Sequence, residues 1–135
     1  MVIKKKWILA TLGVVVLGMI LYFAIFFISR TDIKNVHVEG YVFDQTTEKP
    51  LSNVKVIINN NRYEDDAGNA NYDEYLGNDR IELNTNANGF YSTEINKSAY
   101  LWIDFSKESY QSKTEDGQYA SKNMKFKTYL KKDKD

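Results

Sequence analysis

An uninterrupted apolar segment near the amino terminus constrains this chain more than any other feature. Trp7 to Ile28 holds 22 residues and no charged side chain. A helix of that length spans about 33 Å, which is enough to cross the hydrocarbon core of a bilayer. The segment predicts one transmembrane α-helix, residues 7–28, that contacts membrane lipid. It separates a short basic tail, residues 1–6, from the bulk of the chain.

The charges that flank this segment predict its orientation. Three lysines, residues 4–6, precede it, whereas Arg30 and Lys34 after it are offset by Asp32. Because the more basic flank stays in the cytoplasm, we expect a cytoplasmic amino terminus and a carboxy-terminal domain that is periplasmic or extracellular.

A cleaved signal peptide is the alternative interpretation of the same segment. Its apolar region is usually about 7 to 15 residues long and is followed by small residues at the cleavage site. Here the segment is longer and ends in FFISRTD, without an A-x-A pattern. We therefore expect an uncleaved signal anchor that crosses the cell (inner) membrane once.

The remaining residues have the size and composition of one β domain. About 100 residues are left, a normal length for a single sandwich. From Thr31 onward, 14 Lys and Arg stand against 18 Asp and Glu, a net charge of −4. That balance gives no basic face for nucleic acid. The chain has no cysteine, which excludes disulfides, thiolate metal sites and cysteine nucleophiles.

Short segments with alternating apolar residues predict strands throughout this part of the chain. We interpret 38–58 as an opening β-hairpin around Pro50, and 124–130, whose lysines share one face, as an exposed edge strand. No segment after residue 30 has helical periodicity. The predicted fold is therefore all-β: a seven-stranded-type antiparallel Greek-key β-sandwich preceded by one transmembrane α-helix. The other predicted strands are 81–85, 90–95 and 100–106.

The strand motifs resemble those of a known family. VEGYVFD, PLSNVKVII, TNANGFY and YLWIDFSKESY follow one another as in the carboxypeptidase regulatory-like domain, part of the transthyretin-like and collagen-adhesin B-type superfamily. The resemblance covers residues 36–130, between a linker, 29–35, and a charged tail, 131–135. It implies a β-sandwich and is nearly silent on activity. The positions that carry it are Gly40, Val42, Asp44, Thr47, Pro50, Leu51, Val54, Val56, Thr85, Gly89 and Tyr91.

Physical roles follow for several of these positions. We expect Asp44 to accept hydrogen bonds from the turn after its strand, and Gly89 to relieve a turn that a Cβ would strain. We expect the ring of Tyr91 to pack inward while its hydroxyl finds a polar partner. Glu48 and Lys49 depart from the pattern, because they stand where the family often has glycine.

His37 is the only histidine. Some enzymes share the transthyretin-like architecture: hydroxyisourate hydrolases use more than one histidine with an arginine, and intradiol dioxygenases bind iron through histidine and tyrosine pairs. A lone histidine argues against both. We therefore predict no catalytic residue and no cofactor, with His37 as a surface or partly buried strand residue. An enzyme of this superfamily stays an alternative.

Residues 59–80 form an irregular insertion, interpreted as a long loop or a decorated hairpin. Seven acidic residues lie between Glu64 and Glu82 and are opposed only by Arg80. The spacing does not fit an EF-hand loop. A solvated acidic loop is the favoured interpretation. The alternative is a calcium site that uses Asp65, Asp66, Asp73 and Glu74.

Tyrosines in the same insertion indicate a binding surface. Tyr63, Tyr72 and Tyr75 lie among Asn and Asp, a composition typical of recognition loops and sugar-binding surfaces. The alternative is that these rings only fasten the loop to the sandwich. Tyr110 and Tyr119, farther along, are expected as isolated anchors.

The predicted function is that of a membrane-anchored binding or scaffolding module at the cell envelope, with a protein or glycan partner. The alternative is a structural subunit of a membrane complex that works through its transmembrane helix.

Overall fold

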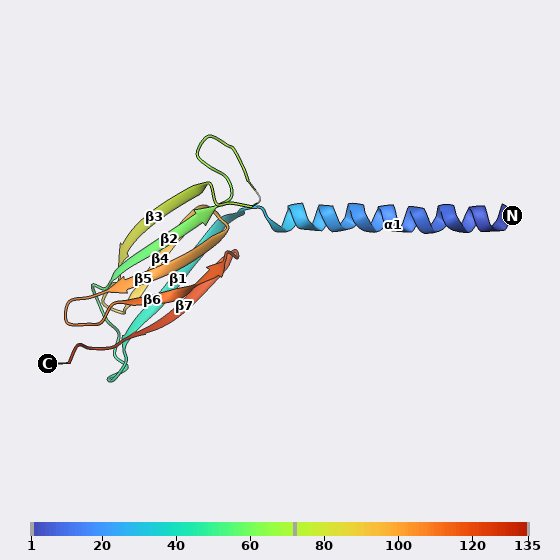
Figure 1. Cartoon of the computed structure of the whole chain (residues 1–135). Helices are drawn as coiled ribbons and strands as arrows, with labels where there is room; N and C mark the ends of the chain where they lie inside the picture. The colour runs from blue at the N-terminus through green and yellow to red at the C-terminus, as the bar shows by residue number, and fades with distance from the viewer. Residues whose placement is uncertain (1, 72, 135) are drawn as a thin grey trace. The chain divides into compact units, whose positions relative to one another are not determined.

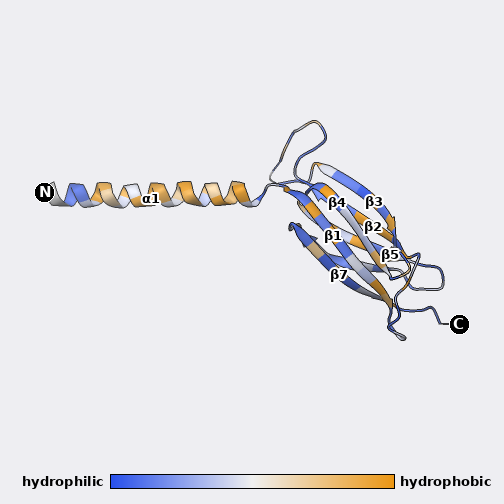
Figure 2. Ribbon diagram, turned by 180° about the vertical axis from the view of Figure 1, so that it is seen from behind, coloured by the Kyte–Doolittle hydropathy of each residue, from blue (hydrophilic) through white to orange (hydrophobic). Residues whose placement is uncertain are grey.

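The protein, in a computed structural model that describes residues 2–71 and 73–134, consists of two compact units, residues 1–31 and 32–135. The first unit contains one helix, α1 (Val2–Ser29). Within it, Lys4–Ser29 is long and apolar enough to cross a membrane, and Figure 2 shows that hydrophobic residues predominate along most of the ribbon. The helix begins earlier than the predicted span of 7–28, because the basic residues before Trp7 are also helical.

The second unit is built of β-strands arranged in two sheets (Figure 1). One sheet has the strand order β4-β1-β7, and the other has the order β3-β2-β5-β6. The strands are β1 (Ile33–Asp44), β2 (Lys55–Arg62), β3 (Gly77–Asn84), β4 (Phe90–Ser98), β5 (Tyr100–Ser106), β6 (Lys113–Tyr119) and β7 (Asn123–Leu130).

Side chains from both sheets meet in one hydrophobic cluster. On β5, the predicted alternation is confirmed: Leu101, Ile103 and Phe105 are buried, and the residues between them face outward. Each fully buried side chain of this size contributes about 1.5–3 kcal/mol. Figure 2 shows the same alternation of apolar and polar positions along the strands. Other members of the cluster are Val36, Val38, Val42, Leu51, Val54, Val56, Ile58, Tyr91, Ile95, Met124 and Leu130.

The predicted opening hairpin, 38–58, is wrong. β1 and β2 belong to different sheets, and the segment between them crosses from one sheet to the other. The two sides meet only at its start, where Phe43 and Pro50 form an isolated bridge. Alternation indicates which side chains of a strand are buried, but strands of both sheets alternate in the same way because both face one core. Alternation therefore cannot distinguish a hairpin within one sheet from a connection that crosses between the two sheets.

The predicted antiparallel pairing holds for the other strand pairs of the two sheets but not for β1 and β7, which pair in parallel. Parallel neighbours need a long connection, and here every other strand of the domain lies between the two in sequence. β7 is an edge strand of its sheet, as its lysine-bearing face predicted.

The irregular insertion is shorter than the predicted 59–80. β2 continues to Arg62 and β3 starts at Gly77, and the two strands pair antiparallel on either side of residues 63–76. The insertion is therefore a decorated hairpin. The carboxylate of Asp32 fastens its first residues, because it accepts hydrogen bonds from the backbone N–H groups of Tyr63 (2.8 Å) and Glu64 (3.2 Å).

The turn after β1 is organised by Asp44, as expected. Its carboxylate accepts hydrogen bonds from the backbone N–H groups of Thr46 (2.8 Å) and Thr47 (2.9 Å) and from the hydroxyl of Tyr110 (2.7 Å). These bonds, the one from Thr47 foremost, lower the pKa of Asp44 to about 2. Glu48 has a φ of 59°, which explains why a glycine would suit this position.

Candidate binding surface

Two of the tyrosines singled out in the insertion lie on the outer face of the four-stranded sheet, beside two further tyrosines. Tyr63 follows β2, and Tyr75 lies near the end of the loop. Tyr100 starts β5 and pairs with Tyr119 at the end of β6. We call these four residues the tyrosine row. Tyr72, the third tyrosine predicted, lies outside the described residues.

The four rings form a continuous chain of contacts. Ring centroids are 5.2 Å apart between Tyr63 and Tyr75, 6.2 Å between Tyr75 and Tyr100, and 5.4 Å between Tyr100 and Tyr119. The first pair is tilted by 33°, and the second is stacked with an interplanar angle of 23°. Tyr119 is 76% exposed and Tyr75 is 36% exposed. The row is therefore a contiguous aromatic surface that solvent reaches, and Tyr119 is not the isolated anchor that the sequence predicted.

Packing fixes the middle of the row. A Cβ on Gly117 of β6 would lie 2.0 Å from the hydroxyl oxygen of Tyr100, so the ring of Tyr100 lies directly over this glycine and would have to shift if the position carried a side chain. Burial, together with the neighbouring Tyr63, raises the pKa of Tyr75. Rings held in this way lose little conformational entropy when a partner binds.

Polar groups continue the same outer face beyond the row. The amide of Asn59 on β2 donates to the carboxylate of Asp104 on β5 (2.8 Å), and the hydroxyl of Thr114 on β6 donates to the other oxygen (2.5 Å). Trp102 points to this face by strand alternation and is half-buried. The face thus combines aromatic rings with hydrogen-bonding groups on neighbouring strands.

The acidic loop is organised around Arg62, which sequence reasoning missed. Its guanidinium donates to both oxygens of Asp79 (2.8 and 3.2 Å), to the carboxylate of Asp66 (2.8 Å) and to the backbone carbonyl of Glu64 (2.9 Å). Lys97 forms a further ion pair with Glu64 at 2.9 Å. Positions 56, 58, 60 and 62 of β2 are all buried, so continuing the alternation by two more buried positions, 60 and 62, would have found Arg62.

Among the described residues, the structure does not group the four acidic residues named for calcium. Asp65 accepts hydrogen bonds from the backbone N–H groups of Ala67 (2.9 Å) and Asn69 (2.8 Å) and so builds its own turn, while Asp66 pairs with Arg62. Across residues 2–71 and 73–134, no three acidic or histidine side chains, including those of Asp73 and Glu74, are grouped closely enough to hold a metal ion.

His37 lies on the outer face of the other sheet, between two carboxylates. Its Nδ1 contacts Glu94 on β4, and its Nε2 lies 3.1 Å from Glu39 on its own strand. Glu39 is also paired with Lys125 of β7, at 3.3 Å. Hydrogen bonding to Glu94 first, and then to Glu39, raises the pKa of His37. The histidine is half-buried, as predicted for a strand residue.

A second aromatic cluster on this sheet was not predicted. Ring centroids are 5.0 Å apart between Tyr41 and Phe90, 6.2 Å between Tyr41 and Phe43, and 5.7 Å between Phe43 and Tyr129. Lys127 Nζ lies 5.4 Å from the ring centroid of Phe43, within cation–π range. The signal was present as alternate aromatics in YVF, but pairing them with residues 90 and 129 required the strand register.

The sequence matches no protein-family model and no curated protein. The structure is similar to 3-chlorocatechol 1,2-dioxygenase from Rhodococcus opacus 1CP (TM-score 0.53, 19% identity, 73% of this chain and 59% of that one). It is also similar to catechol 1,2-dioxygenase from Acinetobacter sp. ADP1 (TM-score 0.55, 14% identity, 73% and 53%).

A group B streptococcus pilus 2b backbone protein matches with a TM-score of 0.48, at 13% identity, over 74% of this chain and 42% of that one. The chain spans little more than half the length of the two dioxygenases. At these identities their likeness shows the fold alone.

Proposed function

We propose that this protein is a membrane-anchored β-sandwich that acts as a binding or scaffolding module at the cell envelope, with the tyrosine row as its contact surface. The observation that carries the proposal is the unbroken chain of four rings that runs from the loop across β5 to β6. Tyrosine is enriched at the centre of protein interfaces, because it combines a large apolar ring with a hydroxyl.

The anchoring part of the proposal rests on α1. The segment Lys4–Ser29 has the length and apolarity of a membrane span, and the three lysines at residues 4–6 favour a cytoplasmic amino terminus. The helix then crosses the membrane once and is not cleaved, and the two-sheet domain lies outside the cytoplasm. Its partner is a protein or a glycan of the envelope, and the domain works by binding, without catalysis.

The family part of the proposal is that the domain is a carboxypeptidase regulatory-like β-sandwich with Greek-key connections. Three of the family's positions have the expected physical roles. Asp44 holds its turn, Gly89 has a φ of 71°, and Tyr91 packs its ring inward with 2% exposure. The expected polar partner of the Tyr91 hydroxyl is wrong, because that buried oxygen has no hydrogen-bond partner among the described residues.

Replacing the outer rings of the tyrosine row tests the binding role. The full chain is purified in neutral detergent from its own membranes, as wild type and as a Tyr75→Ala/Tyr119→Ala variant, and the bound material is quantified. Truncating a tyrosine at the centre of an interface costs about 2 kcal/mol, or about thirtyfold in affinity. Tyr41→Ala is the matched control, because that ring is 45% exposed but lies on the other sheet.

Loss of the bound material in the double variant, with retention in the control, supports the proposal. Equal retention in all three proteins rejects it. Protease or glycosidase treatment of the captured material then assigns the partner to proteins or to glycans.

Exchange of the anchor tests whether the helix only presents the domain at the bilayer or makes the contacts of a structural subunit. Residues 7–28 are replaced by an unrelated transmembrane helix, and the two-sheet domain is left unchanged. If the helix only holds the domain at the bilayer, partner binding should persist after the exchange. Loss of binding while the domain stays folded would instead favour a subunit that works through its helix.

A further inference from the structure

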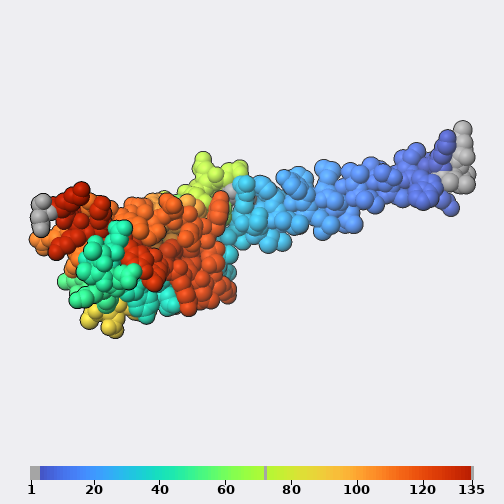
Figure 3. Space-filling view, turned by 90° about the horizontal axis from the view of Figure 1, so that it is seen from below, coloured from blue at the N-terminus to red at the C-terminus, as the bar shows by residue number. Residues whose placement is uncertain are grey.

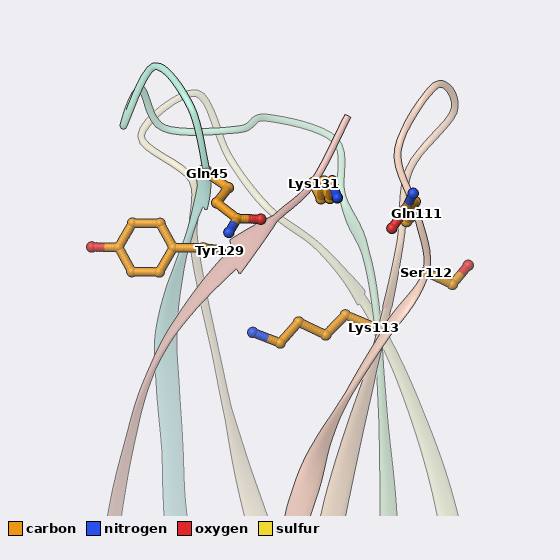
Figure 4. Close-up of a pocket in the computed structure, with 6 residues that line it drawn as sticks. All are labelled: Gln45, Gln111, Ser112, Lys113, Tyr129 and Lys131. Carbon is orange, nitrogen blue, oxygen red and sulfur yellow. The ribbon is translucent and has the colours of Figure 1, made fainter. Parts of the chain in front are cut away.

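A polar groove lies at one end of the two-sheet domain, apart from the tyrosine row. It has a volume of about 560 Å³ and lies where β1 and β7 end and β6 begins. Figure 4 shows the side chain of Lys113 reaching across the gap toward the β7 side, where Gln45 and Tyr129 lie. We call it the end groove. Its lining residues are Gln45, Gln111, Ser112, Lys113, Tyr129 and Lys131.

Backbone hydrogen bonds hold the walls of the end groove in place. The N–H of Gln45 donates to the carbonyl of Leu130 (2.9 Å), and the N–H of Gln111 donates to the carbonyl of Lys131 (2.9 Å). Tyr110 is bridged to Lys132, and its hydroxyl is bound to Asp44 of β1. In Figure 3 the turn after β1, in blue-green, lies against the carboxy-terminal residues, in red. The groove is therefore formed by fixed backbone before any ligand arrives.

The lining of the end groove is cationic although the domain as a whole is acidic. It contains two lysines and no carboxylate, whereas residues 31–135 carry a net charge of −4. The depression around Arg62, at the opposite open edge between β3 and β4, has five carboxylates and two cations in its lining. Each depression thus contains two cations, but only the carboxylates around Arg62 outnumber them, so of these two the end groove has the net positive lining.

The hydrogen-bond donors in the end groove have few partners of their own. Lys113 lies 3.4 Å from Glu115, whose carboxylate also accepts from the hydroxyl of Thr128 (3.0 Å). Within the described part of the chain, Lys131 forms no ion pair, and the side chains of Gln45 and Gln111 form no hydrogen bond. Ammonium and amide N–H groups that face one space complement the oxygens of an anion.

We propose that the end groove binds an anionic oxygen group, a carboxylate or a phosphate, of a ligand that the tyrosine row does not contact. Lys113 and Lys131 supply the charge from opposite sides of the groove. Gln45 and Gln111 supply directional hydrogen bonds through their side-chain amides. The proposal is independent of the function assigned to the tyrosine row.

Titration of the full chain in neutral detergent micelles tests this site. Backbone amide NMR signals are followed at pH 7 and constant ionic strength with sodium phosphate, with sodium acetate, and with phosphatidylglycerol added to the micelles. Sodium chloride and phosphatidylcholine serve as blanks. We expect saturating shifts at residues 111–113 and 131 with at least one of the three anions. The effective anion identifies a free phosphate, a carboxylate or a lipid phosphate as the source.

Two lysine variants decide whether the end groove is responsible. Lys113→Gln and Lys131→Gln should each weaken the response by about fivefold, the effect of losing one exposed charge contact. Lys125→Gln, on β7 but paired with Glu39 outside the groove, should leave it unchanged. Shifts that grow without saturation, that chloride reproduces, or that persist when both groove lysines are replaced would overturn the proposal. Unchanged signals elsewhere establish that the variants are folded.

Discussion

Gly89 is the position where the structure most clearly predicts that a substitution will destabilise the domain. It has a φ of 71°, and a Cβ there would lie 2.5 Å from the backbone carbonyl oxygen of Val42 and 3.2 Å from the backbone nitrogen of Leu51. Both atoms are fixed, because the N–H of Val42 donates to the carbonyl of Gly89 and the N–H of Leu51 donates to the carbonyl of Val42, each at 2.9 Å. Gly89→Ala therefore forces backbone to move in the core of the crossing between the sheets.

The expected cost has two parts. Placing an L-residue in the left-handed region costs about 1–2 kcal/mol, and weakening the two backbone hydrogen bonds costs about 1 kcal/mol each. Alanine also lowers the conformational entropy of the unfolded chain, which offsets about 0.4–1 kcal/mol of this destabilisation. We expect Gly89→Ala to destabilise the domain by about 2–3.5 kcal/mol.

Gly68→Ala is the matched control for this prediction. Gly68 also has a positive φ, 85°, but no atom lies within 4 Å of its virtual Cβ, so only the conformational cost of about 1 kcal/mol applies. For a domain of this size, each kcal/mol shifts the melting temperature by about 4–8 °C. Melting is followed by the fluorescence of Trp102 in a Trp7→Phe background, which removes the other tryptophan. Equal shifts in the two alanine variants would refute the close-approach argument.

Three further predictions concern single side chains. The pKa of the His37 imidazole, followed by NMR, should lie above 6.5, and Glu94→Gln should lower it. Because the folded pKa is raised, the pairing stabilises the domain below about pH 6.5, and this contribution is lost as the pH rises through the folded pKa. An unchanged pKa in the variant would contradict the pairing. The lowered pKa of Asp44, about 2, means that its contribution to stability is present above about pH 4 and is lost as the pH falls toward 2; Asp44→Asn should flatten the acid limb of a melting curve measured against pH. The buried hydroxyl of Tyr91 has no hydrogen-bond partner within the described residues. Tyr91→Phe should therefore leave the free energy of unfolding in urea unchanged or raise it by up to about 1 kcal/mol. A decrease of about 2 kcal/mol would instead indicate that the hydroxyl forms a hydrogen bond.

Strand positions and buried faces could be predicted from the sequence because they depend on local alternation. Leu101, Ile103 and Phe105 are buried as expected, and β7 lies at an edge. The sheet to which each strand belongs could not be predicted in this way. A crossing between sheets and a hairpin bury the same residues, and the parallel partner of β1 is separated from it by most of the chain.

The candidate binding surface was predicted in part for the same reason. Tyr63 and Tyr75 were identified by their composition and loop position, but joining them to Tyr100 and Tyr119 requires the register of β2, β5 and β6. The neutralisation of the acidic loop by Arg62 was within reach of the sequence, because that residue continues a buried alternation on β2.

The central claim, that the anchored domain binds its partner through the tyrosine row, is tested most directly by site-specific photo-crosslinking of the full chain in its own membranes. A benzophenone amino acid replaces Tyr119 in one protein and Tyr41, on the other sheet, in a second. The account predicts a discrete crosslinked species from position 119 that is lost when Tyr75→Ala is added, and none from position 41. Equal crosslinking from both positions, or none from position 119, would contradict it.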